Sequence, residues 1–224
     1  MATQCLPMTK KQANTITGGL TQTSKMPCLS YSLPIIACIT GHRMRAIAGS
    51  VCATCYAGKN FYAMYAGTIE PAQHARLDAT VNADFETWVS AMVCLIGADP
   101  YFRWLDSGDL QSIDMLERVA EVCRRTPKTR HWLPTREYGI VAAFSAQYDI
   151  PLNLNIRLSG MFPDKPVKIP ASLSGVAGVT VSNVHTKAAG ALGKRCIAPD
   201  QNGKCVDCRE CWKRTVKATS YQNH

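Results

Sequence analysis

The residues best suited to chemistry in this sequence are cysteines near its C-terminus. Cys205, Cys208 and Cys211 follow one another with two residues between neighbours, and eight residues separate Cys196 from Cys205. Thiolates at this repeated spacing can each bind a different iron of one cluster, and a fourth completes the shell. Zinc favours two well-separated pairs, although these four thiolates would also suffice. The spacing therefore predicts an iron–sulfur cluster, most simply [4Fe-4S], with zinc as the alternative.

A second group of cysteines lies in the N-terminal quarter of the chain, at Cys28, Cys38, Cys52 and Cys55. Cys52 and Cys55 have the two-residue gap of a metal-ligand pair, and Cys28 is expected to join them as a third ligand. Cys38 lies in the apolar stretch 33–39, where core packing is an alternative role. With three protein ligands, one iron would keep a position open for a substrate or cofactor.

Composition supports metal binding over disulfide bonding. The chain has 224 residues, is 46% hydrophobic and 18% charged, and contains eleven cysteines. It has no secretory signal and no apolar run of bilayer length, so we expect a soluble protein of a reducing compartment, where thiols stay reduced. The odd cysteine count also argues against a closed disulfide framework. Cys94 and Cys123 fall on predicted helices and are expected to pack in the core.

The formal net charge of +9 suggests a polyanionic partner, such as a nucleic acid or a nucleotide. The alternative is a basic surface that only keeps the protein soluble. No membrane association is expected. The oligomeric state is not encoded in any pattern of the sequence.

The order of apolar patterns predicts the fold. Residues 71–96 have helical periodicity with a break near Asn82 or Asp84. Short strands at 101–105, 131–134, 152–158 and 176–181 alternate with helical segments at 113–123 and 140–148. This alternation predicts an α/β fold, either a partial (β/α) barrel or an open parallel sheet, with cysteine-rich, metal-bound loops near both ends.

The same patterns predict one domain preceded by an arm. Residues 1–24 are polar and are expected to be a flexible arm, and residues 25–224 form a single metal-binding domain. Within it we expect a cysteine-rich loop at 25–65, β/α units at 71–190 and a cysteine cluster at 191–224.

Polar residues follow the predicted strands, where parallel α/β folds bind their ligands. The strongest candidates for substrate binding are Asp109, Arg136, Glu137 and Arg157. A carboxylate-bearing or nucleotide-like ligand would suit this set. The alternative for Asp109, and for its neighbour Asp106, is capping of the helix that follows near Gln111.

Several blocks of sequence resemble one family of bacteriophage proteins. They are KMPCLSYSLP, GSVCATCYAGK, FRWLDSGDLQS, HWLPTRE, NLNIRLSG, RCIAP and CVDCRECW. Together, in this order from Lys25 to His224, they resemble the uncharacterised phage gene product eighty-eight family. The resemblance implies a phage source and expression in the cytoplasm of the bacterial host.

A looser likeness concerns layout. The segment Cys52-Ala-Thr-Cys55-Tyr56 ahead of β/α units is similar to radical S-adenosylmethionine proteins. Those proteins hold a three-cysteine cluster at the mouth of a partial barrel and often an auxiliary cluster near the C-terminus. This likeness implies S-adenosylmethionine as a further cofactor.

Taken together, the sequence favours an iron–sulfur protein that is a redox or radical-type enzyme of unknown substrate. The alternative is a non-catalytic zinc or iron–sulfur protein in which the cysteines hold loops together and the basic surface binds a nucleic acid or a host protein.

Overall fold

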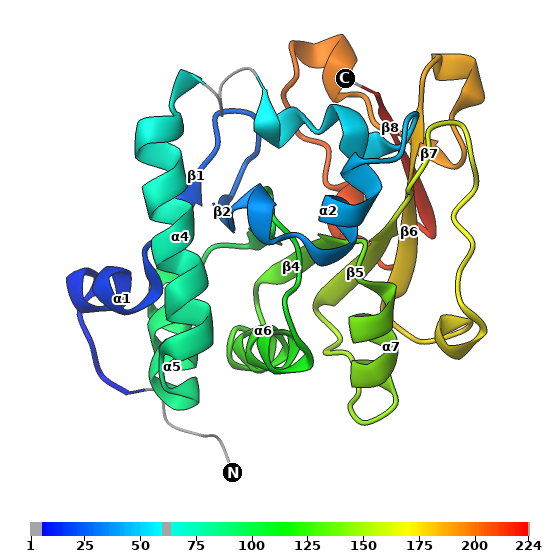
Figure 1. Ribbon diagram of the computed structural model, residues 1–224. Helices are drawn as coiled ribbons and strands as arrows, with labels where there is room; N and C mark the ends of the chain where they lie inside the picture. The colour runs from blue at the N-terminus through cyan, green and yellow to red at the C-terminus, as the bar shows by residue number, and fades with distance from the viewer. Residues whose placement is uncertain (1–5, 60–63, 224) are drawn as a thin grey trace.

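A single eight-stranded sheet organises the chain (Figure 1). The computed structural model describes residues 6–59 and 64–223. The strands are β1 (Thr21–Gln22), β2 (Leu29–Tyr31), β3 (Tyr101–Trp104), β4 (Arg130–Thr135), β5 (Leu154–Ser159), β6 (Val179–His185), β7 (Lys194–Arg195) and β8 (Ala218–Gln222). Their order across the sheet is β1-β2-β3-β4-β5-β6-β8-β7.

The sheet is mostly parallel and open. β1 pairs antiparallel with β2, and every other described pairing is parallel. β1 and β7 are its two edges, so the strands within the described residues do not close into a barrel. The predicted α/β class with an open parallel sheet is confirmed, and the partial barrel is not.

The described α-helices, except the first, connect the parallel strands. They are α1 (Lys10–Thr17), α2 (Ile39–Arg45), α4 (Ala66–Asn82), α5 (Phe85–Ile96), α6 (Ile113–Arg125) and α7 (Tyr138–Ser145). Because β2 to β6 are adjacent in chain order, right-handed crossovers place α6 and α7 on the same face of the sheet. No described helix is long and apolar enough to cross a membrane.

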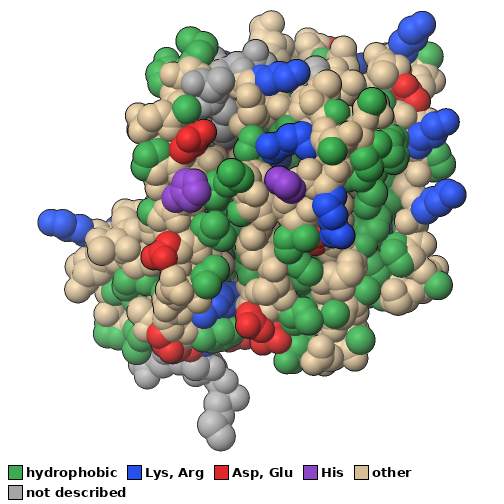
Figure 2. All heavy atoms as spheres, viewed as in Figure 1, with side chains coloured by type: hydrophobic (Ala, Val, Ile, Leu, Met, Phe, Trp, Pro, Cys, Tyr) green, Lys and Arg blue, Asp and Glu red, His purple; other side chains and the backbone are tan. Residues whose placement is uncertain are grey.

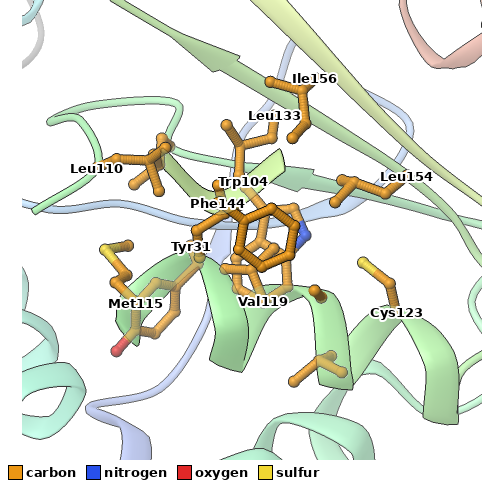
Figure 3. Packing of buried hydrophobic residues seen from close by; sticks show 14 of the residues in the cluster. Tyr31, Trp104, Leu110, Met115, Val119, Cys123, Leu133, Phe144, Leu154 and Ile156 are labelled. Atoms are coloured by element: carbon orange, nitrogen blue, oxygen red, sulfur yellow. The ribbon is translucent and has the colours of Figure 1, made fainter. Parts of the chain in front are cut away.

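The main core fills the space between this helical face and the sheet (Figure 3). Alternate residues of β3, β4 and β5 point into it, including Trp104, Leu133 and Ile156, and α6 and α7 contribute Val119 and Phe144. All five side chains are fully buried. The apolar face of α6 thus packs against the apolar side chains of one face of the sheet.

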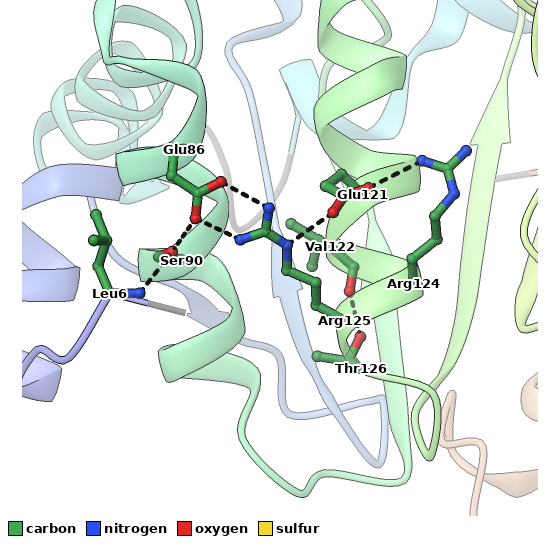
Figure 4. Close-up of polar contacts among 8 residues, drawn as sticks. All are labelled: Leu6, Glu86, Ser90, Glu121, Val122, Arg124, Arg125 and Thr126. Carbon is green, nitrogen blue, oxygen red and sulfur yellow. Dashed lines mark hydrogen bonds and ion pairs between the residues drawn. The ribbon is translucent and has the colours of Figure 1, made fainter. Parts of the chain in front are cut away.

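Charged residues join α5 to α6 at the edge of this core (Figure 4). The guanidinium of Arg125 binds both oxygens of Glu86, at 2.5 and 2.7 Å, and its Nε donates to Glu121 at 2.8 Å. Bidentate geometry makes this one of the stronger classes of ion pair. The N-terminal segment is tied to the same network, because Leu6 N donates to Ser90 Oγ, which in turn donates to Glu86.

Part of the predicted flexible arm is a helix instead. Residues 1–5 lie outside the described part of the chain, but Lys10–Thr17 is a helix. Thr9 caps it by accepting from Gln12 N, and Ala13 packs fully buried against α5. The polar composition of the arm concealed the helix, because its contact with α5 needs only a narrow stripe of small residues.

The other predicted elements lie close to their expected positions, with two differences. α4 begins at Ala66, so Pro71 lies inside the helix rather than in its first turn. The break after Asn82 is confirmed, with Asp84 capping α5. The C-terminal region, expected to be a cysteine cluster alone, also supplies β7 and β8.

A buried histidine links the sheet to α6. Trp104 Nε1 donates to His131 Nδ1 at 3.3 Å, and His131 Nε2 lies 2.9 Å from Thr126 Oγ1, which donates to Val122 O at 2.7 Å. These partners require a neutral imidazole with its proton on Nε2. Burial lowers the pKa of His131 from 6.5 to about 3.

This histidine should make the fold sensitive to mild acid. Between pH 6.5 and about 3 the unfolded chain binds a proton that the folded chain does not, so stability falls as pH falls through this window. Moving from pH 7 to pH 5 should cost about 2 kcal/mol from this group. Urea unfolding of the wild type and of His131→Gln at both pH values measures it. The substituted protein should lose that part of the pH dependence, and equal pH dependence in the two proteins would show that His131 does not carry it.

Candidate functional site

Three cysteines come together beside the C-terminal ends of the central strands. Cys38 precedes α2, Cys52 lies in the short helix η2 (Val51–Thr54), and Cys55 follows η2 directly. Val51 N donates to Met161 O at 2.9 Å, which fixes η2 beside the loop that follows β5. We call Cys38, Cys52 and Cys55 the first thiol group.

A glycine leaves room between two of these sulfurs. A Cβ atom placed on Gly41 would lie 2.9 Å from Cys38 Cβ, 3.6 Å from Cys38 Sγ and 3.8 Å from Cys52 Sγ. The two sulfur atoms are therefore within about 7.4 Å of each other, across a space that any other side chain at position 41 would enter. This observation groups Cys38 with Cys52, and it does not assign Cys38 to apolar packing.

The electrostatic surroundings of the group disfavour free thiolates. Burial raises the pKa of Cys38 to about 12, and the nearby Asp109, Cys55 and Cys52 add to the rise. Burial also raises the pKa of Cys52, which the guanidinium of Arg136 opposes. A bound metal cation reverses this balance, because its charge deprotonates the thiols that coordinate it.

The predicted substrate carboxylates instead hold this site together. Glu137, 5% exposed, accepts from Thr40 N and from Thr40 Oγ1, both at 2.7 Å, in the first turn of α2. Asp109, also 5% exposed, accepts from Leu110 N, Thr135 Oγ1 and the backbone N of Arg136. Burial raises the pKa of Asp109 to about 6 despite these bonds. Glu137 thus fixes the helix that follows Cys38, and Asp109 joins the ends of β3 and β4.

The turn that carries Asp109 depends on a glycine. Gly108 has φ +75°, and a Cβ atom there would lie 2.6 Å from Leu33 Cβ. Leu33 N also donates to Ser107 O at 2.9 Å. The turn therefore closes directly on the chain that leads from β2 into Cys38.

Arg136 is the predicted site residue that retains exposure. It is half-buried, its Nε donates to Gly160 O at 3.1 Å, and it lies close enough to the first thiol group to affect the pKa of Cys52. On α2, His42, Arg43 and Arg45 are exposed. Figure 2 shows Lys and Arg side chains gathered over this part of the face, around α2 and the loops beside it. Arg136 and Arg45 both lie close enough to Cys52 to lower its pKa, and we call these two arginines the cationic rim.

Arg157 lies elsewhere. It was expected at the mouth with Asp109, but it is fully buried on the face of the sheet opposite α6 and α7. Its guanidinium donates to the carbonyl oxygens of Cys211 (3.0 Å), Glu210 (2.9 Å), Lys213 (3.3 Å) and Val181 (3.1 Å). Strand alternation turns position 157 away from the helical face, and the C-terminal segment covers it, so Arg157 does not lie at the mouth with Asp109.

The remaining cysteines of both motifs form a second thiol group on this opposite face. Its members are Cys28, Cys196, Cys205, Cys208 and Cys211. Cys196, Cys205 and Cys208 interact electrostatically with one another, and Cys211 interacts with the first two of these. The prediction that Cys28 lies with Cys52 and Cys55 is corrected, because the structure places Cys28 near Cys205.

Aromatic and basic residues surround the second thiol group. Trp132, Trp212 and Tyr221 pack about it, and Cys211 Sγ lies 3.1 Å from Tyr221 Oη. Arg103 and Arg209 lower the pKa values of Cys28 and Cys205 against the larger effect of burial. Neither arginine was singled out in the sequence, because β3 and the C-terminal segment meet only after folding.

The two cysteines expected to pack do so. Cys123 is fully buried in the main core, and Cys94 packs against the small cluster formed by α1 and α5. Within residues 6–59 and 64–223, no three or more His, Cys, Asp or Glu side chains are arranged to hold a metal ion. The iron–sulfur expectation therefore stays a prediction.

Comparison with known proteins places the chain in a family. The family model described as gene product 88 matches residues 6–214. This chain belongs to the gene product 88 family. It is the family that the sequence blocks resemble, and both thiol groups of this gene product 88 protein fall inside the matched range. No curated protein and no solved structure matches the chain, and the likeness to radical S-adenosylmethionine proteins gains no support.

The clamp between Glu137 and Thr40 should stabilise the first site. Thr40→Val removes the hydroxyl donor of one 2.7 Å bond to a carboxylate, while the backbone donor remains. We expect the free energy of unfolding to fall by about 1.5–3 kcal/mol, as for other hydrogen bonds to charged groups. Urea unfolding measures the change. The matched control is Thr15→Val on exposed α1, which should cost far less, and equal losses would contradict the clamp.

Arg157 should behave as a structural residue. Arg157→Met removes the hydrogen bonds from a buried guanidinium to four carbonyl groups, so we expect unfolding to become easier by about 2–4 kcal/mol. Hydrogen exchange should accelerate in residues 210–213. Arg136→Met, at a half-buried position with one bonded carbonyl, is the comparison and should change stability much less. An Arg157→Met protein of unchanged stability would return this residue to the list of ligand-binding candidates.

Proposed function

We propose that this gene product 88 protein is an iron–sulfur protein with two cysteine-ligated sites, and that the first site carries redox or radical-type chemistry. The observation that carries the proposal is that eight of its cysteines form two separate thiol groups. The first lies at the C-terminal ends of the central strands, and the second lies on the far face of the sheet. Cysteines used only for packing, such as Cys94 and Cys123, do not cluster in this way.

The donor chemistry of both groups fits clusters better than a single zinc ion. A tetrahedral zinc with Zn–S bonds of about 2.3 Å brings its thiolates to within about 4 Å of one another. A cluster binds each thiolate through a different iron and so holds the sulfurs further apart. The sulfurs of Cys38 and Cys52 lie on either side of the open space at Gly41, within about 7.4 Å of each other, which is a spacing that a cluster can bridge. When bound there, a cluster would supply one-electron transfer.

The protein's own residues prepare the first site for an anionic substrate. Three thiols leave one iron of a four-iron cluster without a protein ligand. The cationic rim borders this position, and the nearby carboxylates Asp109 and Glu137 are turned inward by their hydrogen bonds. Arg136 would orient a phosphate or carboxylate group through its exposed guanidinium edge. This polarity favours a nucleotide-like or other anionic substrate over a cationic one.

Metal analysis of protein purified without oxygen tests the proposal. The wild type should contain iron and acid-labile sulfide and should absorb in the visible range. Cys38→Ala should lose about half of the iron by removing the first site, and Cys208→Ala should lose the other half by disrupting the second.

Cys94→Ala is the matched control, since Cys94 is also half-buried but packs away from both thiol groups. It should keep the full iron content. Stoichiometric zinc without sulfide after iron-replete expression would reject the iron–sulfur proposal and favour a non-catalytic zinc protein. Retention of all iron in Cys38→Ala would reject the three-thiol first site.

A further inference from the structure

The second thiol group has one cysteine more than a four-ligand site needs. The sequence spacing selects Cys196, Cys205, Cys208 and Cys211, and leaves Cys28 out. The fold brings Cys28 to the same place from the opposite end of the chain. The spacing of the motif alone therefore cannot decide which four of these five thiols bind the metal.

Cys28 is joined to the C-terminal segment by its backbone surroundings. Cys205 N donates to Lys25 O at 3.0 Å, so the chain before Cys28 runs directly beside Cys205. The side chain of Lys25 covers Gly203, whose added Cβ atom would lie 3.5 Å from Lys25 Cε. Cys28 itself packs against the cluster of Trp132, Cys211 and Trp212.

Cys28 and Cys205 also share their charged neighbours. Arg103 and Arg209 lie close enough to lower the pKa of both thiols, and Cys205 raises the pKa of Cys28. Two arginines beside this pair would offset the negative charge of bound thiolates. Cys28, Cys196, Cys205 and Cys208 are all half-buried, as expected for thiols that share one layer at the surface of the far face.

Cys211 differs from the other four. It is the buried member of the group, 8% exposed, and its sulfur lies within hydrogen-bonding distance of Tyr221 Oη, at 3.1 Å. Its carbonyl oxygen accepts from Asn155 Nδ2 at 2.9 Å and from Arg157 Nε at 3.0 Å. Both contacts hold Cys211 down against the sheet, under the aromatic side chains.

We propose that the ligands of the C-terminal metal are Cys28, Cys196, Cys205 and Cys208, and that Cys211 is a supporting neighbour held by Tyr221. The metal then fastens the segment before β2 to the segment before β8. This assignment rests on the proposed function for the presence of a metal, although it holds for zinc as well as for an iron–sulfur cluster.

The experiment compares Cys28→Ala and Cys211→Ala in the full chain with the metal that the wild type carries. Cys28→Ala should lose the C-terminal metal, about half of the total, whereas Cys211→Ala should keep it. Hydrogen exchange supplies a second readout. In Cys28→Ala, exchange should accelerate at residues 25–29 and at 203–209, and it should stay near the wild-type rate in α6.

Protection in α6 also shows that each variant is folded, so metal loss by general unfolding can be recognised. Full metal content in Cys28→Ala, or loss of the C-terminal metal in Cys211→Ala, overturns the assignment. A wild type with no metal overturns the proposed function instead, and a wild type with zinc at this site overturns only its iron–sulfur identity. The failures of the two proposals are thus distinguishable.

Discussion

The arrangement of this protein depends on how the far face of the sheet is covered. Strands β2 to β6 are adjacent in chain order, so their right-handed crossovers send α6 and α7 to one face and leave the other bare. That bare face carries Arg157 and Asn155 on β5, whose donors cannot be buried without acceptors. The C-terminal segment satisfies them with the carbonyl groups of residues 210, 211 and 213. Trp212 adds a hydrogen bond to Phe102 O at 2.9 Å.

Covering the far face also determines where the cysteines go. The segment that presents its carbonyls to Arg157 contains Cys208 and Cys211, and it returns into the sheet as β8 between β6 and β7. The segment before β2 meets it through the bond from Cys205 N to Lys25 O. The two ends of the chain are therefore held together on a polar and aromatic surface. A thiol group built from residues so distant in sequence is a consequence of this closure.

The sequence predicts the elements with strong periodicity and misses those defined by partners. Residues 113–123 and the strand near 131–134 alternate clearly, so α6 and β4 lie close to their expected bounds. The helical periodicity of residues 71–96 does not correspond to one buried face, because the chain turns between α4 and α5 and Val81 is 61% exposed. α1 and β8 have little periodicity of their own and are fixed by contacts with α5 and β6.

The sequence identifies the candidate thiols but does not predict how the fold groups them. Spacing identifies Cys52 with Cys55 and Cys205 with Cys208, since ligands close in sequence must be close in space. It cannot assign single cysteines such as Cys28 and Cys38, whose partners depend on the path of the sheet. The apolar residues before Cys38 made it resemble a packing residue. In the structure they form a short helical turn, Ile35–Ala37, that leads into α2.

Glu137 and Asp109 illustrate the same limit from the side of charge. Their position after strands signals a ligand-binding mouth, but a carboxylate there serves equally well as an internal acceptor. The hydrogen bonds decide between these roles. Glu137 accepts hydrogen bonds from both donors of Thr40 and so fixes the first turn of α2. The exposed charges at the mouth are those of Arg136 and of the basic residues on α2. The inward carboxylates therefore hold in place the segments that carry the thiols, and the outward arginines would face the anionic substrate that we propose.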